Sequence, residues 1–431
     1  MIDPTMSNTI ENVLILQGGG SLGAFGCGVF KALARSNIRI DIIAGTSIGG
    51  LNASVIAGSK EEDHPEKALE QFWLELAEGS SSSISNNTNL NLPFINGLNR
   101  ILELKKTFEL SLVGGYPMPS ITSRVNTTAT APTADHSAIT HISQIKSIQS
   151  FYNAAIHGNK KVFMPRWRPE YALTDPQYFT PSEWTYLYDH FPLVNTLEKY
   201  IDYNRLQPNG RPNARLLITA VNVLTSEPII FDSSKQQITS KHILATTGYP
   251  RYYFRWVEVE KGVYAWDGSL LSNTPLREVI EASPAKDKRV FLVENYPRHT
   301  DRLPDNLLEV EHRTRDIMFS DKTLHNKRLA KAITYYLEFI DELYNAIEDR
   351  FDLQNVQDKE EFEKIKAKYK KISEEHGAQI KGLYYISRDE PFPNLYENAD
   401  FSIDTIKASI REGELKTKQI LKDYYHHQSV L

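Results

Sequence analysis

Apolar residues near the start of the chain gather in short runs that are separated by glycine-rich turns. Residues 13–17 (VLILQ) and 40–44 (IDIIA) each have the length and composition of a buried strand. The segment from Gly23 to about Arg35 and the stretch that ends near Ala57 carry small and apolar side chains that suit helices. This order of strand, helix, strand and helix predicts a parallel sheet with helices on its faces.

The same patterns predict the rest of the fold. Helices are expected at 65–77, 240–247 and about 403–424, and strands at 215–223, 228–232, 263–266 (VYAW) and near 383–387. Residues 288–296 (KRVFLVENY) are predicted to be the last strand of the sheet, and residues 305–375 to be helical and charged.

Two stretches interrupt this regular pattern. Residues 79–92 and 119–143 are rich in Ser, Thr and Asn, which favours loops over packed structure. A segment of this length inside a compact domain is either a functional loop or an insertion. We therefore expect residues 79–143 to form a mobile insertion that acts as a lid.

The overall composition excludes several classes of protein. With 431 residues, 41% hydrophobic and 24% charged, the chain resembles an ordinary soluble globular protein, and a net charge of -5 gives no general attraction to nucleic acid. The single cysteine, Cys27, excludes an intramolecular disulfide. No apolar run reaches the length of a membrane span, and residues 1–10 lack a signal-peptide pattern, so we expect a cytoplasmic protein. A secretion signal that is not cleaved would leave no such pattern.

The first chemical motif is Gly45-x-Ser47-x-Gly49, which lies directly after a predicted strand and before a helix. A nucleophilic serine needs a sharp turn between strand and helix, and the crowded flanking positions require glycine. Ser47 is therefore the candidate nucleophile. The alternative is a glycine-rich turn in which the serine only caps the helix.

The second motif, GGGSLG at 18–23, follows the first predicted strand. Backbone N–H groups of Gly18, Gly19, Gly20 and Ser21 can converge there on an anion, which in an acyl hydrolase is the tetrahedral oxyanion. The string also fits G-x-G-x-x-G, so a dinucleotide-binding oxidoreductase is the alternative, with Asp41 as the ribose-binding acid. That acid should end the second strand, yet Asp41 lies near its start.

The third motif is Asp267-Gly268, which follows the VYAW strand. A carboxylate at a strand end can accept the proton of a serine nucleophile, and the adjacent glycine admits a second backbone segment. Taken alone, this dipeptide is an ordinary turn. It becomes the candidate base because it occurs together with the other two motifs.

In this order, GGGSLG (18–23), GTSIG (45–49) and DGS (267–269) resemble the motifs of the patatin-like phospholipase family. The sequence WDGSLLSNTPL resembles a bacterial subgroup with an additional C-terminal region. The resemblance implies a three-layer α/β/α sandwich with a mainly parallel sheet over 10–300, and a mostly helical region at 301–431 packed on it. It also implies a Ser47–Asp267 dyad that hydrolyses acyl esters of lipids without a metal or organic cofactor. Leu22 and Ser269 depart from the residues usual in the family, which leaves the substrate preference open.

Alternatives to this interpretation remain. The histidines that follow Asp267 could complete a Ser-Asp-His triad instead of a dyad (His299, His312, His325 and His376). The protein could also be a relative that binds lipid without catalysis. Arg251 and Arg255, within the aromatic segment 248–256, either pack in a loop or approach a lipid headgroup. The basic end of residues 359–371 leaves contact with a membrane surface open, and the oligomeric state is not encoded in any motif.

Overall fold

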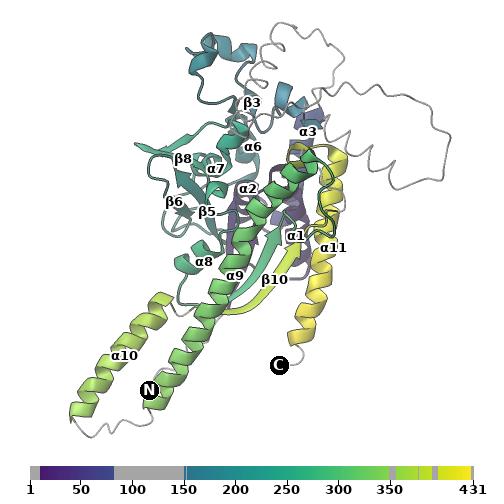
Figure 1. Ribbon diagram of the computed structural model, residues 1–431. Coiled ribbons are helices and arrows are strands. Elements are labelled where there is room, and N and C mark those ends of the chain that lie inside the picture. The colour runs from purple at the N-terminus through teal and green to yellow at the C-terminus, as the bar shows by residue number, and fades with distance from the viewer. Residues whose placement is uncertain are drawn as a thin grey trace, which may run out of the picture. The chain divides into compact units, whose positions relative to one another are not determined.

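The computed structural model describes residues 10–81, 150–151, 153–348, 356–376, 378–390 and 397–428 (Figure 1). The chain divides into a unit made of residues 1–81 with 143–431, and a second unit of residues 82–142. The second unit lies outside the described residues, and so does almost all of the insertion expected at 79–143. All three sequence motifs lie in the first unit.

One eight-stranded sheet forms the centre of this unit, in the order β10-β9-β1-β2-β5-β8-β7, with β6 paired to β5. The first five strands in this order run parallel, whereas β6, β7 and β8 are antiparallel additions. The bounds are Glu11–Leu16 (β1), Ile42–Thr46 (β2), Arg215–Asn222 (β5), Pro228–Asp232 (β6), Val257–Glu260 (β7), Val263–Asp267 (β8), Lys288–Glu294 (β9) and Ile380–Ser387 (β10). The mainly parallel sheet is as predicted.

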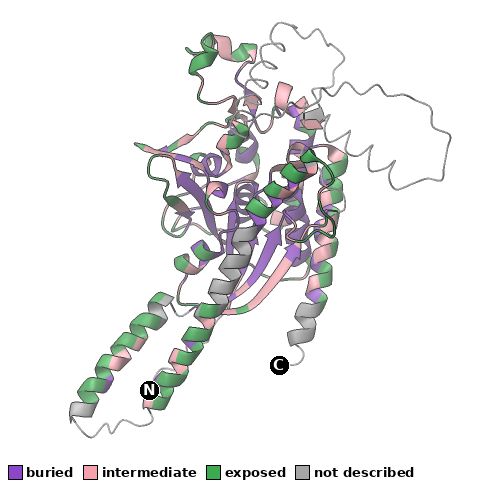
Figure 2. Cartoon of the chain, in the orientation of Figure 1, coloured by how far each residue is buried: buried purple, intermediate pink, exposed green. Residues whose placement is uncertain are grey.

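Helices cover both faces of the sheet because its central strands are apolar on both sides. Leu14 and Leu16 of β1 belong to the core shared with α1, α2 and α3, whereas Val13 and Ile15 pack with α8. This alternation follows from the two-residue period of a strand. Figure 2 shows the central strands buried between the two helical layers. The bounds are Ala24–Arg35 (α1), Ile48–Ala57 (α2), Pro65–Ser81 (α3), Pro192–Tyr200 (α6), Ser240–Thr247 (α7) and Leu276–Ala282 (α8).

The C-terminal region contains three long helices, α9 (Leu307–Glu348), α10 (Val356–His376) and α11 (Ile403–Gln428). Helix α11 lies along α1, where Gly28 and Gly413 allow the two backbones to approach closely. The buried Lys31 of α1 joins this contact through ion pairs with Glu70 (2.7 Å) and Glu414 (2.8 Å). Helix α10 packs on α9 through aromatic stacking of Tyr344. Among the described helices, none combines the length and the apolar character that a membrane crossing requires.

One prediction about the elements was wrong. The strand at 288–294 is not the last strand of the sheet, because β10 pairs in parallel with it and extends the sheet by one strand. The helical character predicted for residues 305–375 is confirmed by α9 and α10. The antiparallel strand β7 and helices α6 and α8 were not predicted, since their short apolar patterns are weak without the neighbours on which they pack.

Candidate active site

Ser47 occupies the sharp turn between β2 and α2. Its backbone angles are φ 56° and ψ −129°, a combination that is strained for any residue with a Cβ atom. The turn is fixed by a hydrogen bond from the Ser47 N–H to Thr246 Oγ1 (3.0 Å), and Thr246 donates in turn to the Thr219 carbonyl (2.7 Å). The serine remains partly exposed, whereas Thr46 before it is buried. The geometry is that of a nucleophile elbow.

The glycines on both sides of Ser47 are required by close contacts. A Cβ atom on Gly45 would lie within 3.0 Å of the Gly49 carbonyl group, across the turn. A Cβ atom on Gly49 would lie equally close to the carbonyl oxygen of Leu16, because α2 starts directly over the end of β1. The G-x-S-x-G spacing therefore reflects the packing of this turn against the neighbouring strand.

Asp267 lies at the end of β8, two strands away from Ser47. Thr46 is paired with Thr219 in β5, and the next residue of β5, Ala220, is paired with Asp267, so the register brings the elbow and the carboxyl group to one level. Asp267 is fully buried, and its Oδ1 accepts a hydrogen bond from the Ser269 N–H (2.8 Å). Its Oδ2 has no hydrogen-bond partner among the described residues.

The environment of Asp267 suits a base that works near neutral pH. Burial raises the pKa of its carboxyl group from 3.8 to about 6, and interactions with the hydroxyl of Ser47 and with Ser269 offset part of that rise. A carboxylate with a pKa close to the working pH is a better proton acceptor than an ordinary aspartate.

We predict that kcat/KM for ester hydrolysis falls as the pH decreases through about 6. Proton transfer from Ser47 requires ionised Asp267, and below its pKa this group is protonated. The measurement is a pH–rate profile on a soluble ester at two temperatures, because the midpoint of a carboxyl group shifts little with temperature and that of a histidine shifts strongly. A midpoint near 4, or one with the temperature dependence of a histidine, would contradict the assignment.

We also predict that Asp267→Asn stabilises the fold at pH 8. The pKa of this group is raised on folding, so the ionised carboxylate lowers the free energy of unfolding. This cost is complete above about pH 6 and disappears below the ordinary pKa of 3.8. A rise from 3.8 to about 6 corresponds to about 3 kcal/mol. Thermal melting should therefore show a higher Tm for the variant at pH 8, and a smaller gain at pH 4.5. If the variant and the wild type had equal melting temperatures at both pH values, ionised Asp267 would not destabilise the fold.

The glycine-rich loop follows β1, beside the elbow. Gly19 (φ 154°) and Gly20 (φ 61°) adopt backbone conformations that favour glycine, and the loop continues into a short 3-10 helix, Gly20–Gly23, and then into α1. Of the four proposed oxyanion donors, the Gly18 N–H points to the Asn273 carbonyl (3.4 Å). The N–H groups of Gly19, Gly20 and Ser21 donate to no other described residue, as expected at the start of a helix.

The remaining motif glycines pack tightly around the same centre. Gly18 lies against Ser47, Gly23 against Ile48, and Gly268 against the backbone of Thr219. Asp41, the acid of the dinucleotide alternative, precedes β2 and accepts a hydrogen bond from the Asn12 N–H (2.9 Å). It therefore lies at the end of the sheet opposite to the glycine-rich loop, where it cannot reach a ribose bound at that loop.

Among the described side chains, no histidine forms a hydrogen bond or an ion pair with Ser47 or Asp267. His299 is exposed and lies in the wall of a cavity of about 470 Å³, which includes neither Ser47 nor Asp267 in its lining. His312 is buried in a separate network of charged groups. The side chains of His325 and His376 lie outside the described residues.

The same cluster around His312 is the one place in the described residues that resembles a metal site. Its ligand atoms, with those of Glu390 and Glu397, lie within 4.8 Å of one another. Arg315 and Arg388 already pair with the two carboxylates. Although burial lowers the pKa of His312, its hydrogen bonds to the glutamates raise it to about 9, so the imidazole is protonated at neutral pH. This donor set fits an ion-pair network better than a cation.

Segment 248–256 contacts the site at its first residue. The Gly248 carbonyl accepts a hydrogen bond from the Asp267 N–H (3.1 Å) and so helps to fix the candidate base. Arg255 lies over the ring of Tyr186, 5.4 Å from its centroid, in a cation–π contact.

Several polar residues that support the site were not predicted from the sequence. Asn295 follows β9 and donates from Nδ2 to the carbonyls of Gln17 (2.9 Å) and Gly18 (3.2 Å). Asn273 accepts from the hydroxyl of Ser269 (3.1 Å). The only signal in the sequence that could have indicated Asn295 is its position directly after β9, which matches the position of Ser47 directly after β2.

Comparison with known proteins assigns the chain to a family. A family model described as patatin-like phospholipase matches residues 14–280. The chain belongs to the patatin-like phospholipase family, and membership implies a lipid acyl hydrolase. No curated protein sequence matches the chain significantly.

Solved structures give distant matches. The crystal structure of VipD from Legionella pneumophila matches with 14% identity and a TM-score of 0.36, over 96% of this chain and 67% of VipD. The ExoU-SpcU complex from the type III secretion system of Pseudomonas aeruginosa matches with 15% identity and a TM-score of 0.23, over 70% of this chain and 46% of the other.

Proposed function

We propose that this protein hydrolyses acyl esters of lipids through a dyad of Ser47 and Asp267. The observation that carries the proposal is a strained, partly exposed serine beside a fully buried carboxyl group whose pKa is raised to about 6. The unpartnered Asp267 Oδ2 is the atom available to accept the proton of Ser47.

The reaction proceeds in two steps. In the first, Asp267 takes the proton from Ser47 Oγ, which attacks the ester carbonyl carbon, while N–H groups of Gly19, Gly20 and Ser21 stabilise the oxyanion. Collapse of this intermediate breaks the ester bond, and Asp267 returns the proton to the departing alcohol. In the second, Asp267 takes a proton from a water molecule that attacks the carbonyl carbon of acyl-Ser47, and it returns this proton to Ser47 Oγ as the ester bond breaks and the fatty acid leaves.

The substrate class is tested by measuring free fatty acid released from phosphatidylcholine vesicles, from a triacylglycerol emulsion and from a soluble p-nitrophenyl ester. Release from at least one lipid, together with cleavage of the soluble ester, is the expected result. Binding to vesicles without release of fatty acid from any substrate would instead support a non-catalytic lipid-binding relative.

A further inference from the structure

A short segment from the C-terminal region lies directly against the glycine-rich loop. This segment is a single 3-10 turn, Glu397–Ala399. Asn398 Nδ2 donates to the Gly19 carbonyl (3.1 Å), and the hydroxyl of Ser21 donates to the Glu397 carbonyl (2.5 Å). A Cβ atom on Gly20 would lie within 3.0 Å of the Asn398 carbonyl oxygen. The segment thus contacts each of the three residues whose N–H groups are proposed to hold the oxyanion.

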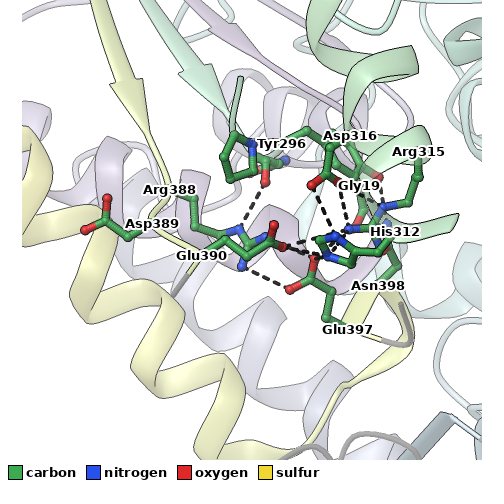
Figure 3. A network of polar contacts seen from close by, with 12 residues as sticks. Gly19, Tyr296, His312, Arg315, Asp316, Arg388, Asp389, Glu390, Glu397 and Asn398 are labelled. Carbon is green, nitrogen blue, oxygen red and sulfur yellow. Dashed lines mark hydrogen bonds and ion pairs between the residues drawn. The ribbon is translucent and has the colours of Figure 1, made fainter. Parts of the chain in front are cut away.

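Buried charged groups also hold this segment in place (Figure 3). Arg315 of α9 donates to Glu397 Oε1 (2.7 Å) and to Asn398 Oδ1, and Arg388, just after β10, donates to both carboxylate oxygens of Glu397 (3.1 Å each). His312 adds a hydrogen bond to Glu397 (3.3 Å). The pairing with arginines is strong enough to keep the pKa of the buried Glu397 carboxyl well below its usual value.

These contacts fix the orientation of the Asn398 amide. Arginine can only donate hydrogen bonds, so the atom that faces Arg315 must be the amide oxygen. The NH₂ group therefore faces the Gly19 carbonyl and the Tyr296 hydroxyl (2.6 Å).

The peptide plane carries this orientation into the proposed oxyanion hole. The Gly19 carbonyl and the Gly20 N–H belong to one planar peptide unit and point in opposite directions. A peptide between two glycines rotates more freely than others, because neither residue has a Cβ atom that restricts it. A carbonyl held by Asn398 therefore makes the Gly20 N–H point away from the C-terminal segment.

A second asparagine acts in the same way on the preceding peptide. Asn295 Nδ2 holds the Gly18 carbonyl (3.2 Å), and this fixes the direction of the Gly19 N–H. Both asparagines lie outside residues 14–280, which match the family.

We propose that Asn295 and Asn398 are positioning residues that orient the Gly19 and Gly20 N–H groups toward the oxyanion. The inference rests on the proposed function, and it makes the C-terminal segment a part of the catalytic apparatus. Oxyanion stabilisation depends on donors that are oriented before the reaction, so loss of either asparagine should lower kcat more than it raises KM.

The test uses the full chain and a soluble p-nitrophenyl ester. Asn398→Asp keeps the acceptor for Arg315 but loses the donor to Gly19, and we expect kcat to fall about tenfold to hundredfold with KM within about threefold of wild type. Tyr296→Phe is the matched control, because it removes the other acceptor of the same amide and keeps the ring stacked on Phe319. This control should retain kcat within about threefold.

A second readout separates orientation from general damage. An alkyl trifluoromethyl ketone adds to Ser47 as a hemiketal oxyanion, and its affinity should fall by the same factor as kcat, with an unchanged melting temperature. Asn398→Ala provides the same comparison if the aspartate variant does not fold. If the wild type is active and these variants keep its kcat, the inference is overturned but the proposed function stands. The same holds if kcat falls together with a lower Tm and a higher KM. An inactive wild type that also fails to bind the ketone would overturn the proposed function and the inference with it.

Discussion

The variant Ser47→Ala is expected to lose ester hydrolysis by at least about 10³-fold in kcat, because the acyl-enzyme route needs the hydroxyl as nucleophile. The fold should be retained, since the Ser47 side chain is partly exposed and the hydrogen bond that fixes the turn comes from its backbone N–H. The measurement is kcat on a soluble ester and on lipid, with circular dichroism to verify folding.

Ser226→Ala is the matched control for this variant. Ser226 is another serine with positive φ (61°), but it lies in the exposed turn between β5 and β6. Its replacement should leave the rate unchanged. Comparable rates for Ser47→Ala and wild type would remove Ser47 from the mechanism.

Asp267→Asn is expected to lower kcat by at least about 10³-fold, because an amide preserves the shape of the carboxyl group but cannot accept the serine proton. His299→Ala should stay within about tenfold of wild type, since this histidine is exposed and is not joined to Asp267. Asp267→Asn is inactive in a dyad and in a triad alike, so His299→Ala and the matching single replacements of His312, His325 and His376 distinguish the two. Loss of activity in a folded variant of any one of these histidines would favour the triad.

The turn that carries Ser47 could be predicted from the sequence because the residues that form it are consecutive or nearly so. The strand that ends at Thr46, the turn at Ser47 and helix α2 are consecutive, and glycines at 45 and 49 are needed wherever such a turn crosses a neighbouring strand. Asp267 was harder to predict, since an Asp-Gly pair is usually a turn. Its position beside Ser47 depends on the pairing of β8 with β5.

The support of the glycine-rich loop could not be predicted, because it depends on contacts between distant parts of the chain. Asn398 and Gly19 are 379 positions apart. No local pattern marks Asn398 as a partner of the loop, and its role depends on the position of Arg315 on α9 and of Arg388 after β10. The strand near 383–387 was predicted, but its place in the sheet was not, since an edge strand joins a sheet only through the neighbour with which it pairs.

Covalent labelling with a fluorophosphonate tests the central claim most directly, because this reagent reacts with a serine only when base and oxyanion donors activate it. The account predicts one label per chain, located at Ser47 by peptide mapping, with labelling absent in Ser47→Ala and strongly slowed in Asp267→Asn. An unlabelled wild-type protein, or a label on another residue that persists in Ser47→Ala, would contradict it.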